Sequence, residues 1–511
     1  MALLDLTSRV STSPTMLILV ASVVLFASYV LGHTLLFRRL PPNAPSVVSD
    51  NYPITGPLGF WTERWSWFKK RRDQAKTGNF SFHAGAHTVI AMSGDKSRQV
   101  YFESRELGLS EGYSVLFGQA PPPPAQAEGK GEDEDFSMDK HFSRRLAHLL
   151  KNDQFRRKLP ALISDVQEAI DAIKSEPNGI TDPFESIYRI VFRLTIRVVG
   201  ADEIADDAKV LEDTLKHFES IDSSGSATSV MFPKLPSPAV LKRTYAGLQI
   251  YTMIESIVKK RAASGEKHDD ALQYMLDQGD KTYAIVEFIV GALFAGLLNS
   301  GINAAWIMCY LATSSEWLAK ARDEVRDTAA KYAKDPTAPL RYQLNDVPLE
   351  AWEAEFPVID LCLRESIRLN LLGATFRKNL SGRAIPTGTG DEVIPPGAFV
   401  AYAIADAHLD PEIYPDPEKW DPARYLPDRA EDKKKPHAFL GWGVGRHPCL
   451  GMRFAKLEQN IITAYFLASF DFSLEDRSGN KLTAPPKLDT NGHSAQKPKN
   501  GPLIRLSPSE K

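Results

Sequence analysis

Two long apolar stretches dominate the pattern of hydrophobic and polar residues along the chain. The first covers residues 15–37, carries no charged side chain and is rich in Leu, Val, Ile and Ala. At about 1.5 Å per residue it extends roughly 34 Å as a helix, which is enough to cross a bilayer. A cleaved signal peptide is the alternative, but such peptides have shorter apolar regions and a small-residue cleavage site. The stretch therefore predicts a permanent membrane anchor.

The charges that flank this stretch predict its orientation. Arg38 and Arg39 follow it directly, whereas Arg9 stands alone on the other side. Because positive charge near a span stays in the cytosol, we expect the rest of the chain to face the cytosol. A proline-rich segment after the arginines predicts a stiff linker. We therefore expect a lumenal segment at residues 1–14, a transmembrane anchor at residues 15–37 and a linker at residues 38–50. One large domain should follow at residues 51–511.

The second apolar stretch, residues 285–311, is long enough to be mistaken for another membrane span. Glu287, Asn299, Asn303 and several glycines make that interpretation less attractive. We expect a buried central helix instead, followed by helix-favouring residues as far as Ala330.

Shorter patterns predict the other elements. Alternation over residues 80–92 indicates two strands around Ala84-Gly85-Ala86. Helical patterns cover residues 97–104 and 140–173. Three stretches are typical of connections. Residues 112–118 predict an apolar loop, and residues 121–135 predict a solvated proline-rich and acidic insertion. Residues 230–236 predict a proline-bearing linker.

Composition narrows the class of protein. A hydrophobic content of 43% is ample for a buried core, and a net charge of −3 gives no sign of nucleic-acid binding. Three cysteines, Cys309, Cys362 and Cys449, are too few and odd in number for a disulfide framework, so they indicate a reducing compartment.

One of these cysteines lies in a glycine-rich loop, Trp442-Gly443-Val444-Gly445-Arg446-His447-Pro448-Cys449-Leu450-Gly451. Glycines let the backbone approach something flat and bulky. A helical pattern begins at Met452, so free N–H groups and the positive end of the helix dipole favour a Cys449 thiolate. A small buried hydrophobe is the alternative for a lone cysteine, but it leaves the glycines unexplained. A thiolate here suits a haem iron, which such a ligand makes strongly electron-rich.

This loop resembles the haem-binding loop of the cytochrome P450 family, with Trp442 in place of the usual Phe. Two further stretches carry the resemblance: Glu365-Ser366-Ile367-Arg368 matches Glu-x-x-Arg, and Pro417-Glu418-Lys419-Trp420-Asp421-Pro422-Ala423-Arg424 matches Pro-x-x-Phe-x-Pro-x-Arg. The likeness spans about residues 41–508. It implies a mainly α fold, in which a large helical domain joins a small β-rich lobe, with haem b on Cys449.

The resemblance also implies roles for residues around the haem. Trp442 would shield the sulfur, while His447 and Arg377 would bind the haem propionates, and Arg144 and Arg145 lie where the family often adds another basic residue. Glu365, Arg368 and Arg424 would form a buried charge network with a folding role. Solvated surface charge is the alternative for His447 and Arg377. The candidates for substrate contact are Tyr113, Leu116, Phe117 and Ala295, a packed loop being the alternative for the first three.

The central helix departs from the family pattern (Ala/Gly)-Gly-x-(Asp/Glu)-Thr. Here the residues are Ala295-Gly296-Leu297-Leu298-Asn299-Ser300, so Leu298 replaces the acid and Asn299 replaces the threonine. An Asn amide can hold a water by donating and accepting, and Ser300 could add a hydroxyl. A helix polar group bonded to backbone is the alternative. The resemblance to bile-acid-forming sterol hydroxylases and prostacyclin synthase, which share this Asn, leaves both oxygenation and isomerisation open.

Three functions follow from the resemblance. The first is a monooxygenase of the endoplasmic reticulum membrane that oxidises a lipophilic small molecule, such as a terpenoid, sterol or other secondary metabolite, with electrons from NADPH through cytochrome P450 reductase. The basic residues near Cys449 would dock the reductase, or are simply solvated: Lys433, Lys434, Lys435, Arg453 and Lys456. The second is an isomerase or dehydratase of a peroxide that needs no reductase. The third is a non-catalytic haem sensor. The expected partners are the reductase, the substrate and membrane lipid, and no nucleic acid.

Overall fold

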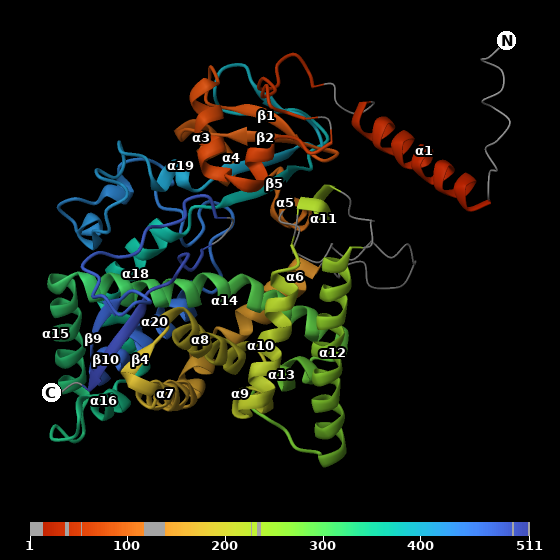
Figure 1. Ribbon diagram of the computed structural model, residues 1–511. Coiled ribbons are helices and arrows are strands. Elements are labelled where there is room, and N and C mark those ends of the chain that lie inside the picture. Colours follow the sequence, from red (N-terminus) through yellow and green to blue (C-terminus); the bar gives the residue numbers. More distant parts are fainter. Residues whose placement is uncertain are drawn as a thin grey trace, which may run out of the picture.

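The computed structural model describes residues 14–35, 40–52, 54–116, 138–225, 227–231, 237–492 and 495–508. Most of these residues are helical (Figure 1). The helices are α1 (Pro14–Leu35), α2 (Leu58–Thr62), α3 (Arg64–Gln74), α4 (Asp95–Glu103), α5 (Leu109–Leu116), α6 (Met138–Leu149), α7 (Asn152–Lys174), α8 (Pro183–Val199), α9 (Asp202–Asp206), α10 (Ala208–Asp222), α11 (Ala227–Met231), α12 (Pro238–Ser264), α13 (Ala271–Asp277), α14 (Thr282–Thr313), α15 (Ser315–Tyr332), α16 (Leu340–Gln343), α17 (Leu349–Ala354), α18 (Pro357–Asn370), α19 (Ala405–His408) and α20 (Met452–Ser469).

The strands form a smaller lobe and two minor sheets. They are β1 (Phe80–Ala84), β2 (His87–Met92), β3 (Leu107–Gly108), β4 (Ile180–Thr181), β5 (Ala374–Asn379), β6 (Ile385–Pro386), β7 (Val393–Ile394), β8 (Phe399–Ala403), β9 (Phe470–Glu475) and β10 (Leu503–Pro508). The main sheet has the order β1-β2-β8-β5-β3, with β2 and β8 parallel and the other neighbours antiparallel. In Figure 1 this sheet lies on one side of α14 and most of the helices lie on the other.

Helix α14 is the axis of the helical part. It packs against α8, α18, α20 and α12, and the side chains from Gly301 to Leu311 are all buried. By length and hydropathy it could cross a membrane, but these contacts make it the core helix that the sequence predicts. Near its end the indole N–H of Trp306 donates to the carbonyl of Gln496 at 3.0 Å, which satisfies a buried polar group as burial requires.

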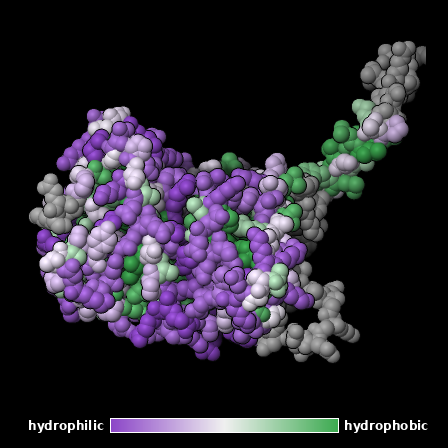
Figure 2. Space-filling view, turned by 90° about the horizontal axis from the view of Figure 1, so that it is seen from below, coloured by the Kyte–Doolittle hydropathy of each residue, from purple (hydrophilic) through white to green (hydrophobic). Residues whose placement is uncertain are grey.

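Helix α1 confirms an apolar helix at the position of the expected anchor. Its side chains from Pro14 to Ser28 are exposed, and Figure 2 shows it as a hydrophobic projection beside a mostly hydrophilic surface. Residues 1–13 and 36–39 lie outside the described residues, so the lumenal segment and the arginines after the anchor stay predictions.

The other predicted elements have mixed outcomes. The two strands around Gly85, the helix near residues 97–104 and the helices of residues 140–173 are confirmed as β1, β2, α4, α6 and α7. The apolar loop at residues 112–118 is wrong, because residues up to Leu116 form α5. A Cβ on Gly112 would lie 2.5 Å from the Cα of Arg377, so this glycine allows close packing of α5 on β5 rather than a turn.

Two predicted connections can be followed only in part. Val230 and Met231 belong to α11 rather than to a linker, and residues 232–236 lie outside the described residues. The acidic insertion and Phe117 lie outside them too.

Candidate functional site

The loop that ends at Cys449 is held in a fixed shape by its own backbone. The N–H of Cys449 donates to the carbonyl of Trp442 at 2.7 Å, and the N–H of Gly443 donates to that of Leu440 at 3.0 Å. Gly443 and Gly445 adopt φ of 63° and 62°. A Cβ on Gly443 would lie 2.4 Å from the His447 oxygen, and one on Gly445 would lie 2.3 Å from the Phe102 oxygen. Other residues would therefore distort the loop.

Within this loop, the thiol of Cys449 is exposed, whereas Cys309 and Cys362 are buried. Helix α20 begins three residues later, and the N–H groups of Gly451 and Met452 favour the thiolate. Desolvation by the surrounding loop is the larger effect, however, and it raises the pKa of Cys449 above its ordinary value. The predicted effect of the helix N-terminus is therefore present but smaller than the opposing effect of desolvation. A bound metal ion, which deprotonates a coordinating thiol outright, would supply the rest.

The guanidinium of Arg377 is buried in β5 without an acidic partner in the described chain. Its Cζ lies 5.3 Å from the centroid of the Tyr101 ring, and within the described residues its side chain makes one hydrogen bond, from Nη1 to the Phe376 carbonyl at 3.4 Å. Buried charges are normally paired, so this residue has the character of a binding group for an anion such as a haem propionate. His447 lies half-buried in the cysteine loop, and its N–H donates to the Val444 carbonyl at 3.4 Å.

Some of the other basic residues near this region have acidic partners, and others do not. Arg145 forms two hydrogen bonds with Asp280, both at 2.8 Å, so its guanidinium is already taken, and Arg144 is exposed. On the surface beside the cysteine loop, three predicted docking residues pair with acids: Lys435 with Glu412, Arg453 with Glu353 and Lys456 with Asp360. Lys433 and Arg446 are exposed and form no ion pair in the described chain.

One face of α14 opens at its centre. Ala295 and Asn299, four residues apart and hence on one face, are exposed, whereas Leu293 and Leu297 are buried. A Cβ added at Gly296 would meet no atom within 4 Å. Space of this kind in the middle of a core helix fits a large flat group against it. The amide of Asn303 donates to the Asn299 carbonyl at 2.8 Å and reinforces the helix below this opening.

Helix α20 joins the cysteine loop to the same turn of α14. The amide of Gln459 donates to the Ser300 carbonyl at 3.1 Å. The Ser300 hydroxyl also hydrogen-bonds the carboxyl of Glu458, which is 1% exposed and leaves Oε2 without a partner in the described chain. Burial raises the pKa of Glu458 to about 8, so it holds a proton at neutral pH. Sequence reasoning missed this residue, although its position on the buried face of α20 could have drawn attention to it.

The predicted charge network is present and completely buried. Arg368 makes a two-pronged contact with Glu365, at 2.8 and 2.7 Å, and the Nε of Arg424 donates to the same carboxylate at 3.1 Å. Arg424 also reaches Glu431 at 2.8 Å. Burial lowers the pKa of Arg368, but the attraction of Glu365 outweighs it and raises the pKa. Such a set holds its segments in one arrangement because no member can lose its partner cheaply.

His408 links this network to the cysteine loop. Its Nε2 accepts from the N–H of Leu440 at 2.9 Å, so Nδ1 carries the proton and donates to the Arg368 carbonyl at 3.0 Å. Burial lowers the pKa of His408 to about 3, which keeps the ring neutral. The helix of the charge network thus supports the start of the cysteine loop through one imidazole.

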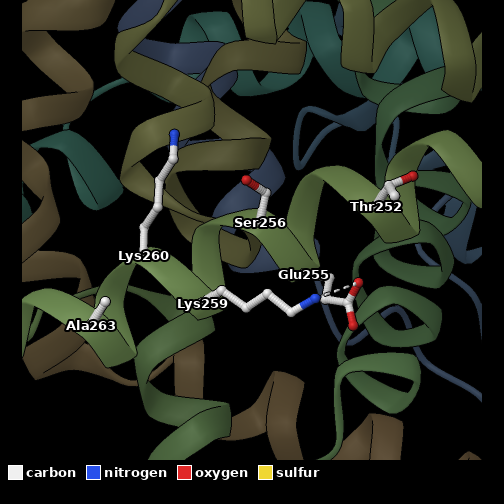
Figure 3. A pocket seen from close by; sticks show the side chains of 6 residues that line it. All are labelled: Thr252, Glu255, Ser256, Lys259, Lys260 and Ala263. Atoms are coloured by element: carbon white, nitrogen blue, oxygen red, sulfur yellow. Dashed lines mark ion pairs between the residues drawn. The ribbon is translucent and has the colours of Figure 1, made fainter.

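Two substrate-contact candidates lie on α5. The ring of Tyr113 is 6.1 Å from that of Phe376, and burial raises the pKa of its hydroxyl while Arg377 lowers it. Leu116 is buried in an aromatic cluster with Phe60, Phe82 and Phe376. A separate surface hollow on α12 (Figure 3) is lined by Thr252, Glu255, Ser256, Lys259, Lys260 and Ala263, all residues of that one helix, and contributes nothing to this site.

Comparison with known proteins agrees with this geometry. The cytochrome P450 family model matches residues 134–501. The chain is 36% identical to the cytochrome P450 monooxygenase AacuE of Aspergillus aculeatus, over 91% of this chain and 93% of the relative. It is 26% identical to the obtusifoliol 14-alpha demethylase of Sorghum bicolor, over 86% of each. The structure of a retinoic acid bound cyanobacterial CYP120A1 has a TM-score of 0.67 at 22% identity, and the match covers 92% of this chain and 100% of that one.

A buried helix with an open face, a glycine loop that presents one thiol and a buried arginine without an acid define a haem-thiolate protein. The chain belongs to the cytochrome P450 family, with haem b as its cofactor, and it is a monooxygenase. The family implies a redox partner and a lipophilic substrate. These relatives decide against the isomerase, which Asn299 had left open, and against the non-catalytic haem sensor.

Proposed function

We propose that this chain is a membrane-anchored monooxygenase that oxidises a terpenoid, a sterol or another lipophilic secondary metabolite with electrons from NADPH through cytochrome P450 reductase. The observation that carries the proposal is the exposed Cys449 in its loop. The shape of this loop requires glycine at two positions, because a Cβ there would clash with backbone oxygens. Relatives named as a fungal monooxygenase and as a sterol demethylase support the substrate class. Bound haem activates dioxygen and supplies the oxidant.

The residues of the chain have separate duties around the haem. Cys449 ligates the iron, and Trp442 shields the sulfur from solvent. Arg377 and His447 bind the propionates, which is supported by the lack of an acidic partner for the buried Arg377 in the described chain. Glu365, Arg368 and Arg424 hold the fold and are not catalytic.

Asn299 organises water on the open face of α14. Its amide donates to one neighbour and accepts from another, so it can orient a proton-carrying water without itself titrating. Ser300 lies one residue further on, where Glu458 and Gln459 fix it from α20. The substrate contacts Ala295 on this face and Tyr113 and Leu116 from the side of α5, and Phe117, which lies outside the described residues, stays a predicted contact.

The chain is anchored in the endoplasmic reticulum by residues 15–37, with its catalytic domain in the cytosol, where the reductase is available. Exposed α1 supports the anchor. Lys433 and Arg446, which form no ion pair in the described chain, are the cations best placed to steer an acidic reductase toward the face that carries Cys449.

Two measurements on the purified full chain test the proposal. The reduced carbonyl complex should show the long-wavelength Soret band of sulfur-ligated haem. With reductase and NADPH, one member of a panel of terpenoids, sterols and fatty acids should gain oxygen by mass spectrometry. A colourless protein refutes haem ligation. Turnover that does not depend on NADPH refutes the assigned electron source.

A further inference from the structure

Arg64, the first residue of α3, is a buried cation with an unusual environment. It is 5% exposed, and its Nε donates to the Phe60 carbonyl at 3.2 Å. Its Cζ lies 4.5 Å from the centroid of the Phe60 ring and 5.6 Å from that of Phe376. Aromatic faces attract a guanidinium, but they do not replace a counter-ion.

Comparison with the other buried arginines in the described chain shows that Arg64 lacks an acidic partner. Five of them pair with a carboxylate: Arg98 with Asp95, Arg197 with Asp165, Arg261 with Asp270, Arg368 with Glu365 and Arg424 with Glu365. Arg64 and Arg377 do not, within the described residues. For Arg64, burial acts without any nearby acid and lowers the pKa to about 9. A buried charge without a partner is costly to a fold, which suggests that its partner is a ligand.

The free N–H groups of Arg64 remain accessible. They have no hydrogen-bond partner in the described chain, yet they are not completely enclosed, unlike the orphaned Nε atoms of Arg71 and Arg193. Part of their surface is therefore left open.

The position of Arg64 relates it to strand β5. Phe376, which Arg64 contacts, is the neighbour of Arg377 on β5, so the two unpaired arginines address opposite faces of one strand. The ring of Tyr113 on α5 lies 6.1 Å from that of Phe376. On α3, the N–H of Ser66 donates to the side chain of Asn491 at 2.9 Å, which ties the C-terminal segment to the same end of the helix. A ligand at Arg64 would thus meet apolar rings on its other sides.

We propose that Arg64 forms an anion-binding subsite on the face of β5 opposite Arg377, which takes the carboxylate of an otherwise apolar ligand. The guanidinium holds the acidic group at the edge of the aromatic cluster that contains Phe60 and Phe376. This inference rests on the proposed function for the haem whose spectrum reports ligand binding. The two fail separately, because the carbonyl spectrum tests the sulfur ligand of haem and can be normal when no carboxylate binds at Arg64.

The test compares matched acid and alcohol ligands on the full-length haem protein in phosphatidylcholine nanodiscs. Decanoate and 1-decanol, and retinoic acid and retinol, are titrated by the Soret shift and by calorimetry, with empty nanodiscs as the blank. We expect the acid of at least one pair to bind the wild type about tenfold more tightly than its alcohol, the scale of one charge-assisted hydrogen bond. Arg64→Met should reduce that ratio to near one.

Matched variants separate the subsite from general charge effects. Lys70→Met removes an exposed cation from the same helix and should leave the ratio unchanged. Should Arg64→Met fail to incorporate haem, Arg64→Gln should lose the preference and Arg64→Lys should keep most of it. The proposal is overturned if the wild type prefers no acid, if Arg64→Met keeps the preference, or if Lys70→Met loses it equally.

A second arm distinguishes two sources of the carboxylate. Adding a long-chain fatty acid, palmitic acid, to the nanodisc bilayer should compete with decanoate for the wild type if the subsite takes its ligand from the membrane. Lack of competition assigns the subsite to a substrate that arrives from solution. Either result supports an anion site at Arg64, provided that the competition or the binding disappears in Arg64→Met.

Discussion

Glu458 should make the stability of this protein depend on pH in an unusual direction. Its carboxyl is 1% exposed, and burial raises its pKa from the model-peptide value of 4.5 to about 8. The folded state therefore binds the proton more tightly than the unfolded state. This contribution to stability is fully present below about pH 4.5 and is lost as pH rises through about 8.

The size of the effect follows from the two pKa values. Between pH 5 and pH 8, linkage of a group with these values removes roughly 3 kcal/mol from the free energy of unfolding, as an order of magnitude. Glu458→Gln keeps the shape and can still accept the Ser300 hydroxyl, but it has no proton to lose. We expect this variant to be more stable than the wild type at pH 8.5 and similar to it near pH 5.

Urea unfolding followed by far-ultraviolet circular dichroism at pH 5.5, 7 and 8.5 measures the difference. The control is Glu418→Gln, which makes the same change at an exposed residue. This control should leave the pH dependence of the free energy of unfolding unchanged. Infrared spectroscopy offers a direct check, because the carbonyl stretch of a protonated carboxylic acid should disappear in Glu458→Gln. Equal pH slopes in the wild type and in Glu458→Gln would refute a protonated buried carboxyl.

Three further predictions address the haem site and its support. Cys449→Ser should lose the long-wavelength Soret band of the reduced carbonyl complex; a variant that keeps it would show that another residue ligates the iron. Asn299→Ala should uncouple NADPH use from product by about tenfold, the worth of one hydrogen bond, with hydrogen peroxide released, and an unchanged ratio of product to NADPH would contradict the water-organising role. Glu365→Gln should cost about 3–5 kcal/mol of unfolding free energy because Arg368 and Arg424 lose their shared counter-ion; urea unfolding at pH 7 measures this, and a loss below 1 kcal/mol would contradict the reasoning.

The sequence predicts those parts of the fold that short-range pattern controls. The core helix α14, the strands β1 and β2 and the three motifs were found because each carries its signal within one stretch. The prediction failed at residues 112–116, where a glycine typical of a loop serves the close approach of α5 to Arg377. That requirement comes from a strand more than two hundred residues away, so no local pattern could reveal it.

Partners of charged residues were equally hidden from the sequence. Arg145 and Asp280 are far apart in the sequence, yet their side chains form an ion pair. Most of the predicted basic docking residues are likewise paired with acids from other segments. The composition of a stretch says which charges exist, while only the fold says which of them remain unpaired.

The unpaired charges and the protonated acid are the parts of this structure that stability alone does not explain. A buried ion pair is at best a modest gain for a fold, but a buried cation without an anion is a loss that something outside the chain must offset. For Arg377 we propose a haem propionate as that complement. Arg64, on the opposite face of the same strand, has none in the described chain, and Glu458 avoids the same loss by keeping its proton. The same free-energy argument thus assigns a propionate to one residue, a ligand carboxylate to the second and a bound proton to the third.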